Sequence, residues 1–101
     1  MYARVMKTVV QEGKSPEATK IATEFVGPAI KEQPGNRGWM LLTAGDVGLS
    51  VSFWETKEDM LQSDQSGYRA QVEKMAALVI APPTVEVYEV QHAEVTTVEA
   101  K

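Results

Sequence analysis

The chain of 101 residues contains no cysteine and only one histidine, and this scarcity excludes several kinds of chemistry. Without cysteine there are no disulfides, no thiolate zinc sites and no cysteine nucleophile. A single histidine cannot build a metal centre that needs several imidazole ligands. The residues therefore predict neither a metal site nor a bound cofactor.

Basic residues and long apolar runs are also scarce. The chain has 10 Lys and Arg against 14 Asp and Glu, a net charge of −4, which argues against nucleic acid or an anionic membrane as a partner. The longest apolar stretch, residues 76–83, is far shorter than the ~20 residues that span a bilayer. Residues 1–7 lack the apolar core of a signal peptide. We therefore expect a cytoplasmic protein with no membrane partner.

The remaining composition suits one compact domain, because 44% of the residues are hydrophobic and 24% are charged. We expect a single domain over residues 1–92. The tail, residues 93–101, is either a strand extension or disordered. A domain this small buries only about 60–70% of the surface that its unfolded chain exposes, so self-association is physically attractive.

The first half of the chain predicts a strand, a helix and a loop. Residues 2–10 are rich in β-branched and aromatic side chains and form the expected first strand. Ser15 is the predicted N-cap of a helix, with Pro16 at its first position. Because Pro28 lacks an N–H, the helix either kinks there or ends and restarts. Residues 33–38 are expected to form a loop.

Two further strands are predicted over residues 39–43 and 47–54. Successive side chains of a strand point to opposite faces of the sheet. One face of the second of these strands is uniformly apolar, and the other carries three small residues before one very large one. The apolar set is Val47, Leu49, Val51 and Phe53, and the other set is Gly48, Ser50, Ser52 and Trp54. Close packing leaves few voids, so the small residues predict a cavity.

The last part of the chain predicts a second helical region and a fourth strand. Residues 56–59 resemble a capping box, and a helical stripe resumes over residues 68–79 after a polar interruption. Residues 84–90 form the last expected strand. The order β-α-β-β-α-β predicts an α+β, ferredoxin-like fold with an antiparallel sheet and two helices on one face. The other face is also apolar, which predicts a homodimer.

Three segments resemble the antibiotic biosynthesis monooxygenase (ABM) domain, one branch of the dimeric α/β-barrel superfamily. They are residues 34–38 (PGNRG), 53–59 (FWETKED) and 81–90 (APPTVEVYEV). The resemblance covers about residues 2–92. It implies that two ferredoxin-like chains close their sheets into a dimeric barrel, with a small-molecule cleft between sheet and helices in each chain.

The resemblance implies a cofactor-independent monooxygenase that acts on a phenol- or quinol-type aromatic molecule. The haem-degrading branch of the family adds an axial histidine soon after the position of Trp54 and an asparagine on the first strand. Residues 55–75 contain no histidine, and residues 2–10 contain no asparagine. Haem degradation is therefore disfavoured.

Six residues are candidates for binding a substrate, and no catalytic residue is assigned. Trp54 occupies the position where the family places a cleft tryptophan, and a ring there could stack on an aromatic ligand. Hydroxyl groups could orient the oxygen atoms of the ligand, and a guanidinium could stabilise a phenolate. The hydroxyl candidates are Ser50, Ser52 and Tyr68, and the guanidinium candidates are Arg37 and Arg69.

Each candidate also has a structural alternative. Trp54 could only pack the core, Tyr68 could lie at its edge, and both arginines could be solvated. His92 is expected to be a solvated surface residue. Two other functions stay open: a non-catalytic dimeric protein that binds a hydrophobic molecule or a stress-related partner, and a purely structural dimer unit. Side chains that fill the face of Gly48, Ser50 and Ser52 completely would favour the structural unit.

Overall fold

The structure is a computed structural model and describes residues 1–63 and 73–96. Within these residues, β1 (Tyr2–Val9), β2 (Asn36–Ala44), β3 (Val47–Trp54) and β4 (Thr84–Glu89) form one antiparallel sheet in the order β2-β3-β1-β4. The helical elements are α1 (Ser15–Ile21), η1 (Ala22–Val26), α2 (Gly27–Lys31), α3 (Lys57–Ser63) and the short η2 (Glu73–Met75). This is the predicted ferredoxin-like α+β fold.

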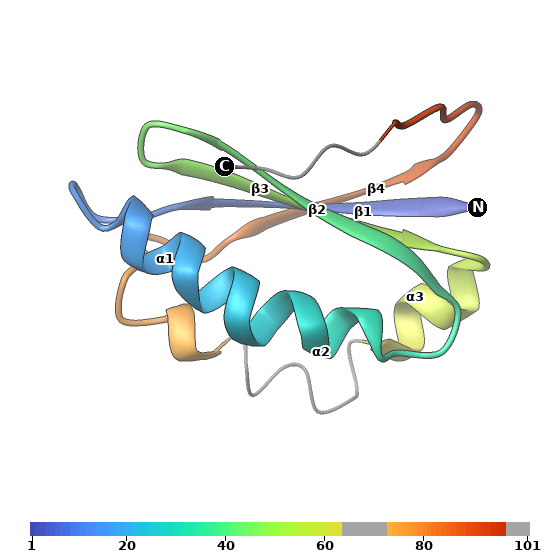
Figure 1. Ribbon diagram of the computed structural model, residues 1–101, viewed down its shortest axis with the longest axis horizontal. Helices are drawn as coiled ribbons and strands as arrows, with labels where there is room; N and C mark the ends of the chain where they lie inside the picture. The colour runs from blue at the N-terminus through green and yellow to red at the C-terminus, as the bar shows by residue number, and fades with distance from the viewer. Residues whose placement is uncertain (64–72, 97–101) are drawn as a thin grey trace.

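The helices lie on one side of the sheet, so the sheet has a covered face and an open face (Figure 1). Gly48, Ser50 and Ser52 of β3 pair with residues of β1 and β2 that face the helices. These three residues therefore lie on the covered face as well. The alternate side chains of β3 therefore lie on the open face. The open face is lined mainly by apolar side chains from β1, β2 and β3: Val5, Val9, Met40, Leu42, Val47, Leu49, Val51 and Phe53.

The first helix is continuous through Pro28, although its form changes on the way. Ser15 is inside α1 and the cap position belongs to Lys14, which makes no side-chain capping bond, so the prediction of Ser15 as N-cap is wrong. A π-helical segment, η1, precedes Pro28, and the Gly27 N–H donates to the Ala22 carbonyl. This wider turn accommodates a residue that has no N–H, and Pro28 then lies in the first turn of α2.

β2 begins earlier than predicted, because residues 36–38 pair with the end of β3 instead of forming a loop. The Asn36 side chain makes this possible. Its Nδ2 donates to the Phe53 carbonyl at 3.1 Å, and its Oδ1 accepts the Gly38 N–H at 3.1 Å. The register shifts between Asn36 and Gly38. A side chain that bonds its own strand and the next one therefore extends the sheet.

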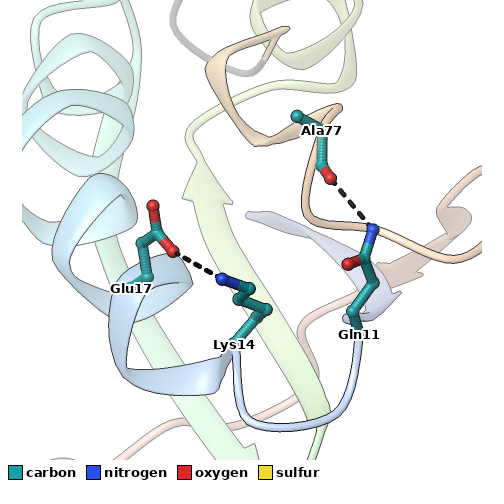
Figure 2. A network of polar contacts seen from close by, with 4 residues as sticks. All are labelled: Gln11, Lys14, Glu17 and Ala77. Carbon is teal, nitrogen blue, oxygen red and sulfur yellow. Dashed lines mark hydrogen bonds and ion pairs between the residues drawn. The ribbon is translucent and has the colours of Figure 1, made fainter.

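The predicted helical stripe over residues 68–79 is wrong for its last part, and residues 68–72 lie outside the described residues. After η2, Val79 forms an isolated bridge with Val10, and the Ile80 N–H donates to the Val9 carbonyl at 3.0 Å. The Gln11 side chain donates to the Ala77 carbonyl at 3.1 Å (Figure 2). The backbone groups of this segment bond to the end of β1, so they do not form a helix.

The main core cluster lies between the end of β3 and the helices α2 and α3. Trp54 and Met60 are 0% and 1% exposed, and Val26 and Ile30 pack with them. α3 begins where predicted, since the Asp59 N–H donates to Thr56 Oγ1 at 3.0 Å. A second cluster of Val10, Ala18 and Leu78 lies at the other end of the helical layer. A space remains between the two clusters.

Gly27→Ala is expected to destabilise the protein, because a Cβ atom at this position would lie 2.5 Å from Cζ3 of Trp39. Overpacking costs about 1–3 kcal/mol, which exceeds the ~1 kcal/mol that alanine gains over glycine in a helix. Gly48→Ala is the matched control, because nothing lies within 4 Å of its Cβ position. Urea denaturation should show a lower free energy of unfolding for G27A only. Equal denaturation midpoints for the two variants would contradict the close contact between Gly27 and the Trp39 ring.

Candidate functional site: a cavity between sheet and helices

The covered face of the sheet carries three cross-strand rows of residues. The inner row is Trp39, Ser52 and Arg4, the middle row is Leu41, Ser50 and Met6, and the outer row is Thr43, Gly48 and Thr8. Burial falls along this order. Ser52 and Arg4 are buried, the middle row is half-buried, and Thr43 is exposed. The rows therefore run from the core toward solvent.

A cavity of about 500 Å³ separates these rows from the helical layer. All three rows line it from the sheet side. α1, η1 and α2 line it from the helix side with Ser15, Ala18, Thr19, Ala22, Val26 and Ile30, and the segment after η2 contributes Val79–Pro83. The lining is mainly aliphatic, with a few hydroxyl groups, and the volume suits a small organic molecule. The cavity predicted from Gly48, Ser50 and Ser52 is confirmed.

Two indole groups hold the serines of the inner and middle rows. Trp39 Nε1 donates to Ser50 Oγ at 2.8 Å, and Trp54 Nε1 donates to Ser52 Oγ at 2.9 Å. A hydroxyl group carries one proton and two lone pairs, so each serine still has a proton to donate. Among the described residues, neither hydroxyl has an acceptor for that proton. The serines are therefore prepared to donate hydrogen bonds to a ligand in the cavity.

Arg4 is the cation of the inner row, and it is 4% exposed. Its Nη1 donates to the Met60 carbonyl at 3.2 Å, and its guanidinium lies 5.4 Å from the centroid of the Trp54 ring. Both contacts compensate the cost of burying a charge. Arg4 thus places positive charge at the buried end of the cavity. Asp46 and Glu73, two acidic residues, are also among the lining residues.

The structure brings together two of the six predicted ligand-binding residues, Ser50 and Ser52. Trp54 is fully buried behind Ser52 and does not line the cavity among the described residues. Arg37 is exposed and pairs with Glu55 at 2.9 Å, outside the lining. Tyr68 and Arg69 lie outside the described residues. Among the described residues, Trp54 is connected to a ligand indirectly, through the Ser52 hydroxyl and the Arg4 guanidinium.

The sequence interpretation missed Arg4 and Trp39. Both have a signal in the sequence, since each shares a strand face with other lining residues at a spacing of two: Arg4 with Met6, and Trp39 with Leu41. Only the register shows that this face is the covered one. Trp39 also needs Gly27, whose missing side chain lets the Trp39 ring lie against α2.

Side chains do not fill the face of Gly48, Ser50 and Ser52, so the condition that would favour a purely structural unit is not met. His92 is exposed, as expected, and lies 3.3 Å from a Glu94 oxygen. Tyr88, on the open face, donates to Glu86 at 2.6 Å, and this hydrogen bond raises the pKa of Tyr88. Neither residue lines the cavity.

Two features are absent from the described residues. No group of three or more His, Cys, Asp or Glu side chains there is arranged to hold a metal ion. No helix among them is long and apolar enough to cross a membrane.

Fold and cavity together define a small α+β protein with a ligand-sized space between sheet and helices. The sequence model of the antibiotic biosynthesis monooxygenase (ABM) family matches residues 1–77, so the chain belongs to this family. No curated protein matches the chain significantly.

Solved structures agree on the fold. SnoaB, a cofactor-independent oxygenase from Streptomyces nogalater, is 14% identical with a TM-score of 0.77, and the match covers 91% of this chain and 94% of SnoaB. A protein of unknown function from Nitrosomonas europaea is 16% identical with a TM-score of 0.80, with coverages of 95% and 94%. A protein from Mycobacterium tuberculosis is 13% identical with a TM-score of 0.75, with coverages of 91% and 96%. At such identities the likeness concerns the fold.

Ser52→Ala is expected to destabilise the protein more than Ser50→Ala. The first change leaves the N–H of fully buried Trp54 without its acceptor, which costs about 1–3 kcal/mol. Trp39 is only half-buried, so water can replace Ser50 at its N–H, and we expect a loss below about 1 kcal/mol. Free energies of unfolding from urea titrations measure both losses, and a larger loss for S50A would contradict the assigned burial.

Proposed function

We propose that the protein is a cofactor-independent monooxygenase that oxidises an aromatic phenol or quinol with O₂. Membership of the ABM family supports the reaction class. The observation that carries the proposal is a mainly aliphatic cavity into which two hydroxyl groups, Ser50 and Ser52, can each donate a hydrogen bond. Such a site binds a flat ring and its oxygen atoms together.

The serines favour the reactive form of the substrate. A phenolate or hydroquinone anion transfers electrons to O₂ far more readily than the neutral phenol. Hydrogen bonds to a charged oxygen are stronger than those to a neutral one, so Ser50 and Ser52 stabilise the anion selectively. The Arg4 guanidinium lies at the same end of the cavity. Trp54 acts as a positioning residue that holds Ser52.

The reaction balances with O₂ as the one co-reactant. A ring C–H carbon of the phenol gains one oxygen atom of O₂ and becomes a quinone carbonyl. The second oxygen atom leaves as water with the C–H and phenolic hydrogens. The substrate supplies all four electrons that reduce O₂. The aliphatic walls keep bulk water from the reacting ring.

Oxygen consumption tests the proposal directly. With a panel of hydroxyanthrones, quinols and other polyphenols, we expect consumption of O₂ that persists after treatment with a chelator. Label from ¹⁸O₂ should appear in the product. Ser50→Ala should lower kcat/KM about tenfold or more, because a hydrogen bond to a charged oxygen contributes about 1.5–3 kcal/mol. Thr23→Ala, which removes a hydroxyl group that bonds only within the helix, should not change it.

Two results would contradict the proposal. If no member of the panel caused O₂ consumption, the monooxygenase assignment would fail. If ligands bound tightly without any O₂ consumption, the non-catalytic binding protein would be the correct function. Equal rates for S50A and the wild type would remove Ser50 from the mechanism.

We also propose that the protein is a homodimer whose two chains pack through the open face. No helix among the described elements covers this face, and most of its side chains on β1, β2 and β3 are apolar. Leu42 on this face is 48% exposed. Burial of apolar surface is worth roughly 25 cal/mol per Å², so a second copy would gain much from covering it.

Leu42→Glu should weaken the dimer, because it would bury a carboxylate in an apolar interface. Leu61→Glu is the matched control, since Leu61 is 52% exposed but belongs to α3 on the other side of the sheet. Native mass spectrometry or light scattering should find mainly monomer for L42E and dimer for L61E. Dimers of equal stability in both variants would exclude the open face as the interface.

A further inference from the structure

The cavity has two chemically different ends. Toward the core, the inner and middle rows surround the space with Trp39, Leu41 and Met6, together with the two serines. Toward solvent, the outer row and α1 surround it with four hydroxyl-bearing residues, Thr8, Thr43, Ser15 and Thr19. The first end suits an aromatic ring. The second end suits a group that makes several hydrogen bonds.

Gly48 forms the floor of the outer end. It lies directly between Thr8 and Thr43 in the sheet. A Cβ atom at Gly48 would meet nothing within 4 Å, and its φ does not lie in the left-handed range. Neither packing nor backbone conformation therefore requires glycine here, although glycine weakens a strand interior. Because glycine has no side chain, the space between Thr8 and Thr43 at this wall of the cavity stays unfilled.

The charges of the lining restrict what the outer end can bind. Asp46 lies in the turn between β2 and β3, next to the outer row, and lines the cavity. Arg4 belongs to the inner row at the opposite end, where it contacts the Met60 carbonyl and the Trp54 ring. A carboxylate or phosphate on a ligand would lie near Asp46 at the outer end and would be repelled by its negative charge. Uncharged and cationic groups would not be repelled.

We propose that the outer row, α1 and Asp46 form a second subsite, which binds a hydroxylated, non-anionic substituent of the aromatic ligand, such as a neutral sugar. This inference rests on the proposed function only in placing an aromatic body at the inner end. Gly48 is the specificity-determining residue, because its bare floor keeps the subsite open. The protein thereby accepts amphiphilic aromatic molecules at least as well as plain rings and selects them over aromatic acids.

Three fluorescent probes with one aromatic body test the subsite: 4-methylumbelliferone, its β-glucoside and its β-glucuronide. Their carbonyl oxygen can accept from the serines, and the two sugars differ only by a hydroxymethyl group against a carboxylate. We expect the glucoside to bind about tenfold more tightly than the glucuronide and at least as tightly as the free aglycone. Asp46→Asn should reduce the discrimination against the glucuronide.

Gly48→Leu should weaken the glucoside about tenfold and change the aglycone less than about twofold, since the leucine fills only the outer end. Thr43→Val, which replaces a hydroxyl group by a methyl group of similar size, should also weaken the glucoside selectively. The Thr43→Val variant keeps the test valid if G48L fails to fold. Leu61→Ala, a change on exposed α3, should leave all three affinities unchanged.

Three results would overturn the subsite. The glucuronide could bind as tightly as the glucoside, the variants could weaken aglycone and glucoside equally, or the glucoside could bind more weakly than the aglycone. Each leaves the proposed function standing, provided the aglycone binds and O₂ is consumed with the phenol panel. If no probe binds to the wild-type protein, both the subsite and the aromatic inner end are wrong, and the O₂ assay then decides the reaction separately.

Discussion

The structure depends on the position of β3 between β1 and β2. Alternate side chains of this strand lie on the open face and on the covered face, so one strand contributes to both. Large apolar residues on one face make the open face. The small residues Gly48, Ser50 and Ser52 on the other face cannot reach the helices, so a space remains there. Because β3 is an inner strand with neighbours on both sides, a shift of one residue in its register would exchange the two faces entirely.

The space does not collapse because its two ends are held by different packing. At one end, Trp54, Met60, Val26 and Ile30 form a tight core behind the inner row. At the other end, the turn after β1 bonds to the segment that follows η2 and fixes the far wall. Between them, the Trp39 ring lies against Gly27 of α2 and bonds to Ser50. The tryptophans therefore set both the shape of the cavity and the direction of its hydroxyl groups.

The candidate site could be predicted only in part from the sequence. Ser50 and Ser52 could be predicted because apolar and small side chains alternate regularly along their strand, and this alternation can be recognised without knowledge of the fold. Trp54 shares that face, yet its ring is buried behind Ser52, because α2 and α3 close over the end of β3. Arg37 is a candidate in the sequence because its guanidinium could stabilise a phenolate, but in the structure Asn36 draws residues 36–38 into β2, and Arg37 pairs with exposed Glu55.

The sequence by itself determined the order of the strands and helices, the limits of β3 and the start of α3, because these follow from local patterns of side-chain period and capping. It also determined that β3 has one uniformly apolar face and one face of small residues that ends in Trp54. Only the tertiary structure decided which face the helices cover, that Trp39 rather than Trp54 lines the cavity, and that Arg4 lies at its buried end. Residues 76–79 do not form the predicted helix for the same reason. These outcomes depend on contacts between residues far apart in the chain, such as Arg4 with Met60 and Val10 with Val79, and no local pattern encodes those contacts.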